Sequence, residues 1–128
     1  LDEDAKPPCL VVNIGNAHTL AGVVDDGRLL SLFEHHTHQM TANKLDDYLK
    51  RVCSRALDSR EVLDDGGHGC YSDETVDFGN LGSILVTGPG RGIMRRSKLD
   101  IIFAAPFGDM MLTGCFGLMD AYLNYIPD

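Results

Sequence analysis

Residues 13–37 read NIGNAHTLAGVVDDGRLLSLFEHHT, and this stretch decides the fold. Two apolar runs flank Asp25-Asp26-Gly27, whose residues tolerate the positive φ that a tight hairpin turn needs. A third apolar run, Cys9–Ile14, begins before the stretch and ends within it, and residues 15–18 after this run are typical of a tight turn. The pattern predicts a three-stranded antiparallel meander with strands over residues 9–14, 19–24 and 29–34.

Polar side chains mark one end of this predicted meander. Because the third strand runs back toward the first turn, it must end beside the residues that connect strands one and two. We therefore expect seven polar residues to lie at one end of one sheet: Asn13, Asn16, His18, Thr19, Glu34, His35 and His36.

The remainder of the chain predicts βα units. Apolar residues recur at helical spacing after Thr41, a suitable N-cap, and predict a helix over residues 41–57. Residues 58–83 are polar and glycine-rich, and we expect a long segment without regular structure that is either functional or mobile. The apolar runs 84–86 and 101–105 predict strands buried on both faces. A last, almost wholly apolar helix is expected over residues 110–125, with Asp109 as its N-cap.

Three antiparallel strands followed by βα units form the element order of the ribonuclease H-like fold, which belongs to the α/β class. Right-handed crossovers would place strand four beside strand one and strand five beyond it, in the order 3-2-1-4-5. The prediction is therefore a five-stranded mixed sheet flanked by helices. Gly15, Gly88 and Gly108 would then lie at the carboxyl edge of the parallel strands, where open α/β sheets bind ligands.

Composition excludes several classes of function. The chain has 128 residues, 11 basic and 19 acidic side chains and a formal net charge of −8, which disfavours nucleic acid as a partner. No apolar run approaches the roughly 18 residues of a membrane span, so we expect no membrane partner and a cytoplasmic location. The four cysteines are widely spaced, which favours free thiols in a reducing compartment, with Cys9 and Cys115 in the core.

The chain begins with LDEDAKPP, which is acidic, contains proline and lacks a targeting pattern. We expect residues 1–8 to be a linker or a fragment boundary, and residues 9–128 to form one domain at the C-terminal end of a longer protein. The missing N-terminal domain of that protein would be its partner. Gly114 and Gly117 would let the last helix approach another backbone closely, either in the core or at an oligomer interface.

Five strings resemble a known family: GNAHTLAGVV, LFEHHT, DDGGHG, TGPGR and PFGDMMLTGCFGLMDAY. They look like the C-terminal region of a bacterial and archaeal family of unknown function that is labelled pyruvate formate-lyase activating protein. A glycyl-radical activating enzyme holds an iron–sulfur cluster with three cysteines at CxxxCxxC spacing, which the four cysteines here do not have. We therefore expect no iron–sulfur cluster and disregard the activity in the label.

A second, more distant resemblance concerns NIGNAHT, which is similar to the DxGNTxT phosphate loop of type III pantothenate kinases and other actin/hexokinase/Hsp70-like ATPases. It implies one half of a nucleotide- or phosphate-binding clamp, which would take ATP with Mg²⁺ or a small phosphorylated ligand. The binding residues would be Asn13, Gly15, Asn16, Thr19, Gly88, Gly90 and Arg91. Asn13 stands where that superfamily has a metal-coordinating Asp, so phosphoryl transfer and nuclease activity are both disfavoured.

The histidines support a different hypothesis, a site for Zn²⁺, Mn²⁺ or Fe²⁺. The candidate ligands are His18, Glu34, His35, His36 and His68. Side chains alternate along a strand, so Glu34 and His36 share one face and His35 takes the other, unless the strand ends at Glu34. His68 would be delivered by the 58–83 segment. Two other interpretations stay open: imidazoles that only bond turn backbone, and a non-catalytic regulatory or interaction domain.

Overall fold

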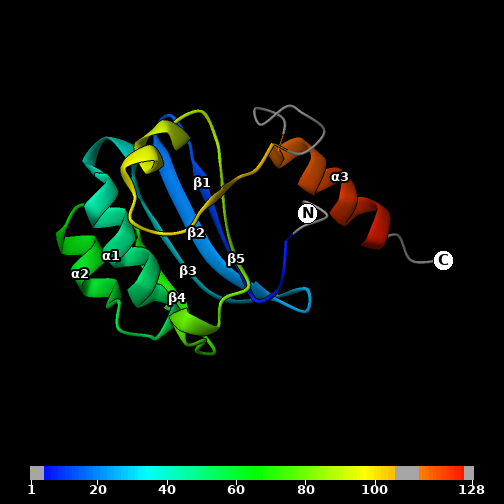
Figure 1. Ribbon diagram of the computed structural model, residues 1–128, viewed down its shortest axis with the longest axis horizontal. Helices are drawn as coiled ribbons and strands as arrows, with labels where there is room; N and C mark the ends of the chain where they lie inside the picture. The colour runs from blue at the N-terminus through cyan, green and yellow to red at the C-terminus, as the bar shows by residue number, and fades with distance from the viewer. Residues whose placement is uncertain (1–4, 106–112, 126–128) are drawn as a thin grey trace.

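The computed structural model describes residues 5–105 and 113–125, which form one mixed α/β structure (Figure 1). The strands are β1 (Cys9–Ile14), β2 (His18–Asp25), β3 (Arg28–His36), β4 (Gly69–Ser72), β5 (Ser83–Thr87) and β6 (Ile102–Phe103). The helices are α1 (Ala42–Cys53), α2 (Ser59–Asp64) and α3 (Thr113–Tyr125), and the 3-10 helices are η1 (Thr37–Gln39), η2 (Phe78–Asn80) and η3 (Arg91–Arg96). All six strands join one sheet in the order β4-β3-β2-β1-β5-β6.

The predicted meander and the parallel pairing of the later strands are confirmed. Strands β1, β2 and β3 pair antiparallel in sequence order, and β1–β5 and β5–β6 pair parallel. The β2–β3 turn uses positive φ at Asp26 (45°) and Gly27 (71°), as its sequence predicted. The order of the five predicted strands is therefore correct, but the predicted count of five is wrong, because β4 adds a sixth strand at the edge beside β3.

The expectation that residues 58–83 lack regular structure is also wrong. Asp58 caps α2, because its carboxylate accepts the backbone N–H of Arg60 at 2.7 Å. Strand β4 follows and pairs with β3 from Ser31 to Glu34. Both elements are too short for their side-chain period to be seen in the sequence.

One predicted boundary of the first helix is confirmed and the other is wrong. The N-cap at Thr41 is confirmed, since its hydroxyl accepts the backbone N–H of Lys44, but α1 ends at Cys53 and not at residue 57. Arg55 adopts φ 58°, a left-handed conformation that ends a helix. In the last helix, the proposed start at residue 110 and the cap at Asp109 lie outside the described residues.

Helices α1 and α2 lie together over one face of the sheet, and α3 lies on the other side of the molecule from them (Figure 1). The core between sheet and α1 buries apolar side chains of every central element, among them Leu10, Val12, Phe33, Leu45 and Leu49. Cys9 is buried as expected, whereas Cys115 is exposed on α3.

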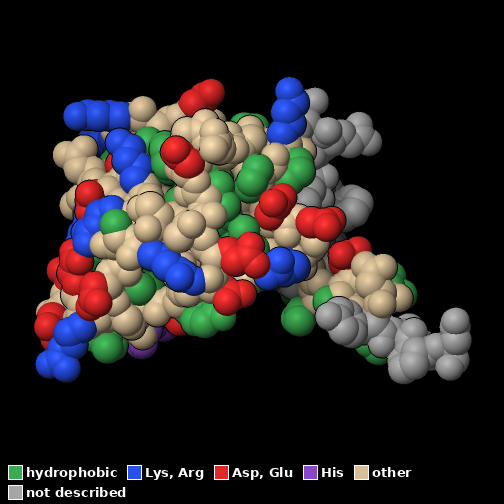
Figure 2. Space-filling view, turned by 90° about the horizontal axis from the view of Figure 1, so that it is seen from below, with side chains coloured by type: hydrophobic (Ala, Val, Ile, Leu, Met, Phe, Trp, Pro, Cys, Tyr) green, Lys and Arg blue, Asp and Glu red, His purple; other side chains and the backbone are tan. Residues whose placement is uncertain are grey.

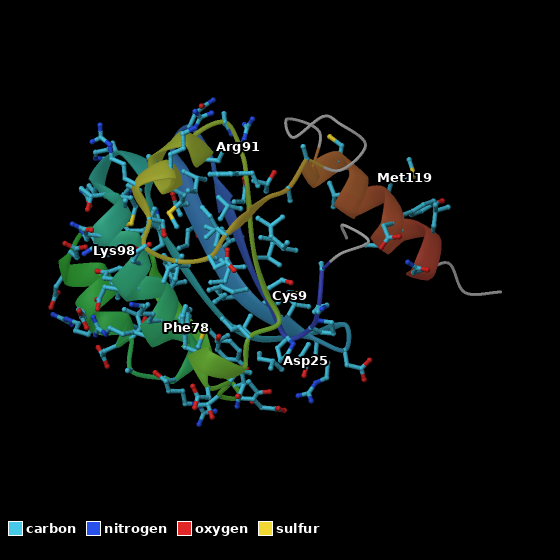
Figure 3. All side chains as sticks on the ribbon, viewed as in Figure 1. Cys9, Asp25, Phe78, Arg91, Lys98 and Met119 are labelled. Atoms are coloured by element: carbon cyan, nitrogen blue, oxygen red, sulfur yellow. The ribbon has the colours of Figure 1, made fainter. Side chains whose placement is uncertain are left out.

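The two ends of the sheet are well separated. Asp25 marks the end with the β2–β3 turn, and Arg91 marks the opposite end, where β5 finishes (Figure 3). The β1–β2 turn and the carboxyl ends of β1 and β5 share the Arg91 end. The histidines of interest lie at this end too, because His18 opens β2 and His36 closes β3. Among the described residues, no helix is long and apolar enough to span a lipid bilayer.

Candidate metal centre

Two histidines on neighbouring strands and a third in the loop before β4 form a cluster, which we call the His centre: His18, His36 and His68. The ring centroids lie 4.9 Å apart for His18 and His36, 5.1 Å for His18 and His68, and 4.7 Å for His36 and His68. One ligand nitrogen from each ring lies within 4.8 Å of the other two. Nitrogens bound to one Zn²⁺ at about 2.1 Å would be roughly 3.4 Å apart, so small side-chain rotations would close the centre.

The hairpin register places the first two histidines together. His18 pairs directly with His36 across β2 and β3. Their side chains lie on the face of the sheet away from α1, because the alternate residues Thr19 and His35 are buried beneath α1. The predicted proximity of His18 and His36 is thus confirmed.

His68 joins the cluster through backbone pairing of its loop with β3. Its N–H donates to the carbonyl of Glu34 at 2.9 Å, and Gly69 pairs with the same residue at the start of β4. Gly69 has φ +108°, a conformation that side chains rarely adopt, so the chain turns sharply where His68 enters the strand. The 58–83 segment therefore does deliver His68 to the predicted place.

The carboxylate of Asp65 anchors the loop before His68. It accepts from Nε2 of the fully buried His35 at 3.0 Å and from the Tyr48 hydroxyl at 2.9 Å, and it forms an ion pair with Lys44. These contacts tie the loop to both β3 and α1. The hydrogen bond from Lys44, followed by that from Tyr48, lowers the pKa of Asp65 below its usual value.

Gly67 packs closely against His35, the imidazole that bonds Asp65. A Cβ at this position would lie 2.5 Å from Cδ2 of His35 and 2.8 Å from Cγ1 of Val62. Only glycine can therefore let the loop pass so close to the buried imidazole, one residue before His68.

The electrostatics of the His centre favour the neutral form of His36. Desolvation lowers the pKa of His36, and the nearby His68 and His18 lower it further. A neutral imidazole is the form that binds a metal ion, and a cation would also relieve the repulsion between protonated rings.

The other predicted metal ligands lie elsewhere. His35 points into the core, so its candidacy as a ligand is corrected: β3 continues through His36 and keeps the alternation of side chains. Glu34 shares the face of His36 but does not belong to the group of converging ligand atoms. His38, which is not among the predicted ligands, has its ring 5.5 Å from that of His36 and is also outside the group.

The residues predicted to bind phosphate lie at the same end of the sheet, but several of them form hydrogen bonds within the protein. The β1–β2 turn meets the loop after β5, since the Gly90 N–H donates to the Ile14 carbonyl at 2.8 Å. The Gly15 N–H donates to the His18 carbonyl at 2.9 Å, and the hydroxyl of the buried Thr19 is 3.0 Å from that of Thr37. Three of the expected phosphate donors are thus already engaged within the fold.

The remaining predicted phosphate-binding residues differ from one another in burial. Gly88 is buried against Ile14 and Asn13, where an added Cβ would collide with both residues. Asn13 and Asn16 are exposed. Arg91 lines a pocket of about 320 Å³ together with Pro89, Gly92, Arg95 and Phe103.

Sequence reasoning missed the anchoring role of Asp65, Tyr48 and Gly67. Only the short spacing between Asp65 and His68 links these residues to a ligand in the sequence, and spacing alone does not show which carboxylate folds back on a buried imidazole.

Comparison with known proteins identifies a family. Residues 1–93 match the family described as "Putative pyruvate format-lyase activating enzyme (DUF1786)", and the chain belongs to that family, as its motifs predicted. No curated protein and no solved structure matches the chain.

Proposed function

We propose that this member of the family binds a divalent metal ion through His18, His36 and His68, as a centre of the hydrolytic type. The observation that carries the proposal is the convergence of three imidazole nitrogens, one from each residue, within 4.8 Å. Three nitrogen ligands with room for a fourth group are the donor set of catalytic zinc sites, whereas structural sites have four protein ligands.

The chemistry of such a centre follows from its open position. A bound ion would lower the pKa of a coordinated water and supply a nucleophile. Glu34 is the candidate base: it lies on the same strand and face as His36, two residues away, or about 7 Å along the strand. In hydrolysis of an ester or amide, the carboxylate of Glu34 would take a proton from the water as the water oxygen bonds to the carbonyl carbon. The bond between that carbon and the leaving group would then break, and the leaving group would depart with the proton.

Metal titration tests the centre directly. We expect the purified chain to take up one equivalent of Zn²⁺ or Co²⁺, with a rise in thermal midpoint that follows ligand occupancy. His18→Ala, His36→Ala and His68→Ala should each weaken binding by more than the 10–100-fold typical of changes outside the ligand shell. His38→Ala is the matched control and should bind like the parent. Equal binding by all four variants would show that the metal sits elsewhere, and a centre that binds metal without turnover would be structural or regulatory.

The nucleotide clamp is a second candidate, in which this ribonuclease H-like, actin-like domain is one half and the N-terminal domain of the same protein is the other. The observation that favours it is the pocket beside Arg91, Arg95 and Phe103, next to the meeting point of the β1–β2 turn and the loop after β5. Guanidinium groups are suited to phosphate, and an exposed aromatic ring to a base.

Calorimetry with ATP, ADP and acyl phosphates on the full-length protein tests this candidate. We expect millimolar or tighter binding that Arg91→Gln weakens, with Arg60→Gln as a control, because Arg60 lies on α2 and pairs with Asp64. Absence of heat and of thermal shift at millimolar ligand would exclude the clamp.

A further inference from the structure

The face of the sheet that carries the His centre also carries an apolar furrow. The furrow has a volume of about 220 Å³, and its lining includes Val11, Asn13, Leu20, Gly22, Leu29 and Leu32. Among the described residues, Asn13 is the only polar side chain in that lining, and no charged side chain contributes to it. Side chains of both charge signs are scattered over the face of the molecule that Figure 2 shows.

The furrow and the His centre are continuous along two strands. Leu20 follows His18 by two residues on β2, and it pairs with Glu34, which precedes His36 by two residues on β3. Side chains two apart on a strand point to the same face, so Leu20, which lines the furrow, lies beside the imidazoles, and Glu34 lies across from it on β3. The distance from the centre to the nearest furrow side chain is about 7 Å along the strand.

The backbone of Gly22 forms the floor of the furrow, because glycine has no side chain to fill it. Gly22 pairs with Leu32, and an added Cβ at Gly22 would lie 2.9 Å from Cδ1 of Leu29 and 3.4 Å from Cβ of Leu32. The glycine therefore leaves space between two leucines that a side chain would otherwise fill.

We infer that the His centre acts on compounds with an aliphatic acyl chain, which lies in the furrow while its carbonyl group meets the metal ion. The inference rests on the proposed metal centre and names its substrate class, an ester or amide of an aliphatic carboxylic acid. The uncharged lining suits a hydrocarbon chain, and its direct continuity with the imidazoles places the polar end of that chain at the metal. Asn13 can donate its amide N–H to an acyl oxygen at the border of the furrow.

Hydroxamates of different chain length test this inference on the Co²⁺-loaded chain. Acetohydroxamate and octanohydroxamate present the same metal-binding group, and the visible spectrum of Co²⁺ reports their coordination. Each CH₂ group that leaves water improves affinity by about fourfold. We therefore expect octanohydroxamate to bind at least tenfold more tightly than acetohydroxamate.

Two leucine variants test where the acyl chain of the hydroxamate binds. Leu20 is 47% exposed and Leu63, on α2, is 51% exposed, so glutamine at either position should leave the fold intact. Leu20→Gln should remove most of the octanohydroxamate advantage without changing acetohydroxamate affinity, and Leu63→Gln should change neither.

The outcomes separate the two proposals. If the chain binds no Co²⁺ or Zn²⁺, the metal centre and the acyl specificity both fail. If metal binds but the two hydroxamates have equal affinity, or if Leu20→Gln keeps the full advantage of the longer chain, the centre stands and the acyl specificity is overturned.

Discussion

Two adjacent histidines on β3 have opposite environments. His36 lies on the outer face of the sheet among other imidazoles, whereas His35 is fully buried and bonds Asp65. The strand alternation makes one residue a candidate ligand and the other a support for the loop that carries the third candidate, His68. Neighbours in sequence thus contribute to one site from opposite faces of the sheet.

Gly67→Ala tests the close passage of that loop over His35. The new methyl group would overlap the imidazole and Val62, so we expect a loss of about 1–3 kcal/mol in the free energy of unfolding. Urea denaturation measures it. Gly92→Ala is the control, because nothing lies within 4 Å of its Cβ position, and a similar loss in both variants would contradict the steric explanation.

The Asp65 anchor predicts a pH dependence. Its pKa in the folded protein lies below its ordinary value of 3.8, so its contribution to stability is fully present above about pH 3.8 and is lost as the pH falls through the folded-state pKa. Asp65→Asn should therefore be less stable than the parent at pH 7, with a difference that narrows in acid. Denaturation curves from pH 7 to pH 2 check this. Asp64→Asn, whose carboxylate is exposed and paired with Arg60, should show a smaller difference at pH 7.

Among the elements, α1 positions the anchor as well as covering the sheet. Its buried stripe includes Leu45, Leu49 and Val52, and its Lys44 and Tyr48 reach Asp65. The start of α1 is defined by Thr41, whose hydroxyl satisfies a backbone N–H that the helix leaves unpaired.

Thr41→Ala should destabilise the protein by about 1 kcal/mol, because the first turn of α1 loses its cap. Thr41→Ser keeps the hydroxyl and should stay close to the parent. Chemical denaturation provides the comparison. Equal stability of the alanine and serine variants would mean that the cap contributes nothing to α1.

In the whole molecule, two apolar surfaces lie on the side away from α1: the furrow of the sheet and the helix α3. Leu118 is 75% exposed and Leu123 is 62% exposed on α3, and exposed apolar surface of this kind favours association. Met119 points away from the sheet (Figure 3).

Replacing Leu118 and Leu123 together by glutamine should leave the thermal midpoint within about 2 °C, since exposed substitutions rarely change stability by more than 0.5 kcal/mol. The same variant should show less concentration-dependent association in light scattering. A large fall in midpoint would contradict the exposed position of α3 and would indicate that the helix packs against an apolar surface in solution.

The sequence by itself determined the meander and the meeting of His18 with His36. The Asp-Asp-Gly turn brings the start of β2 and the end of β3 to the same end of the sheet, which is a local property of a hairpin. The exact pairing of His18 with His36 also depends on the register shift between Val23 and Val24, which the turn does not determine. The same local signals gave the cap at Thr41 and, through the handedness of crossovers, the order of five strands.

Only the tertiary structure decided that His68 completes the cluster and that His35 does not. His68 arrives through β4, a four-residue strand whose pairing with β3 joins residues 35 positions apart, Glu34 and Gly69. No periodicity in so short a strand reveals such pairing, and the loop is held by a carboxylate that bonds groups on β3 and α1. The engaged N–H groups of Gly15 and Gly90 were equally hidden, because glycine-rich turns look alike in sequence whether their donors face a ligand or the fold itself.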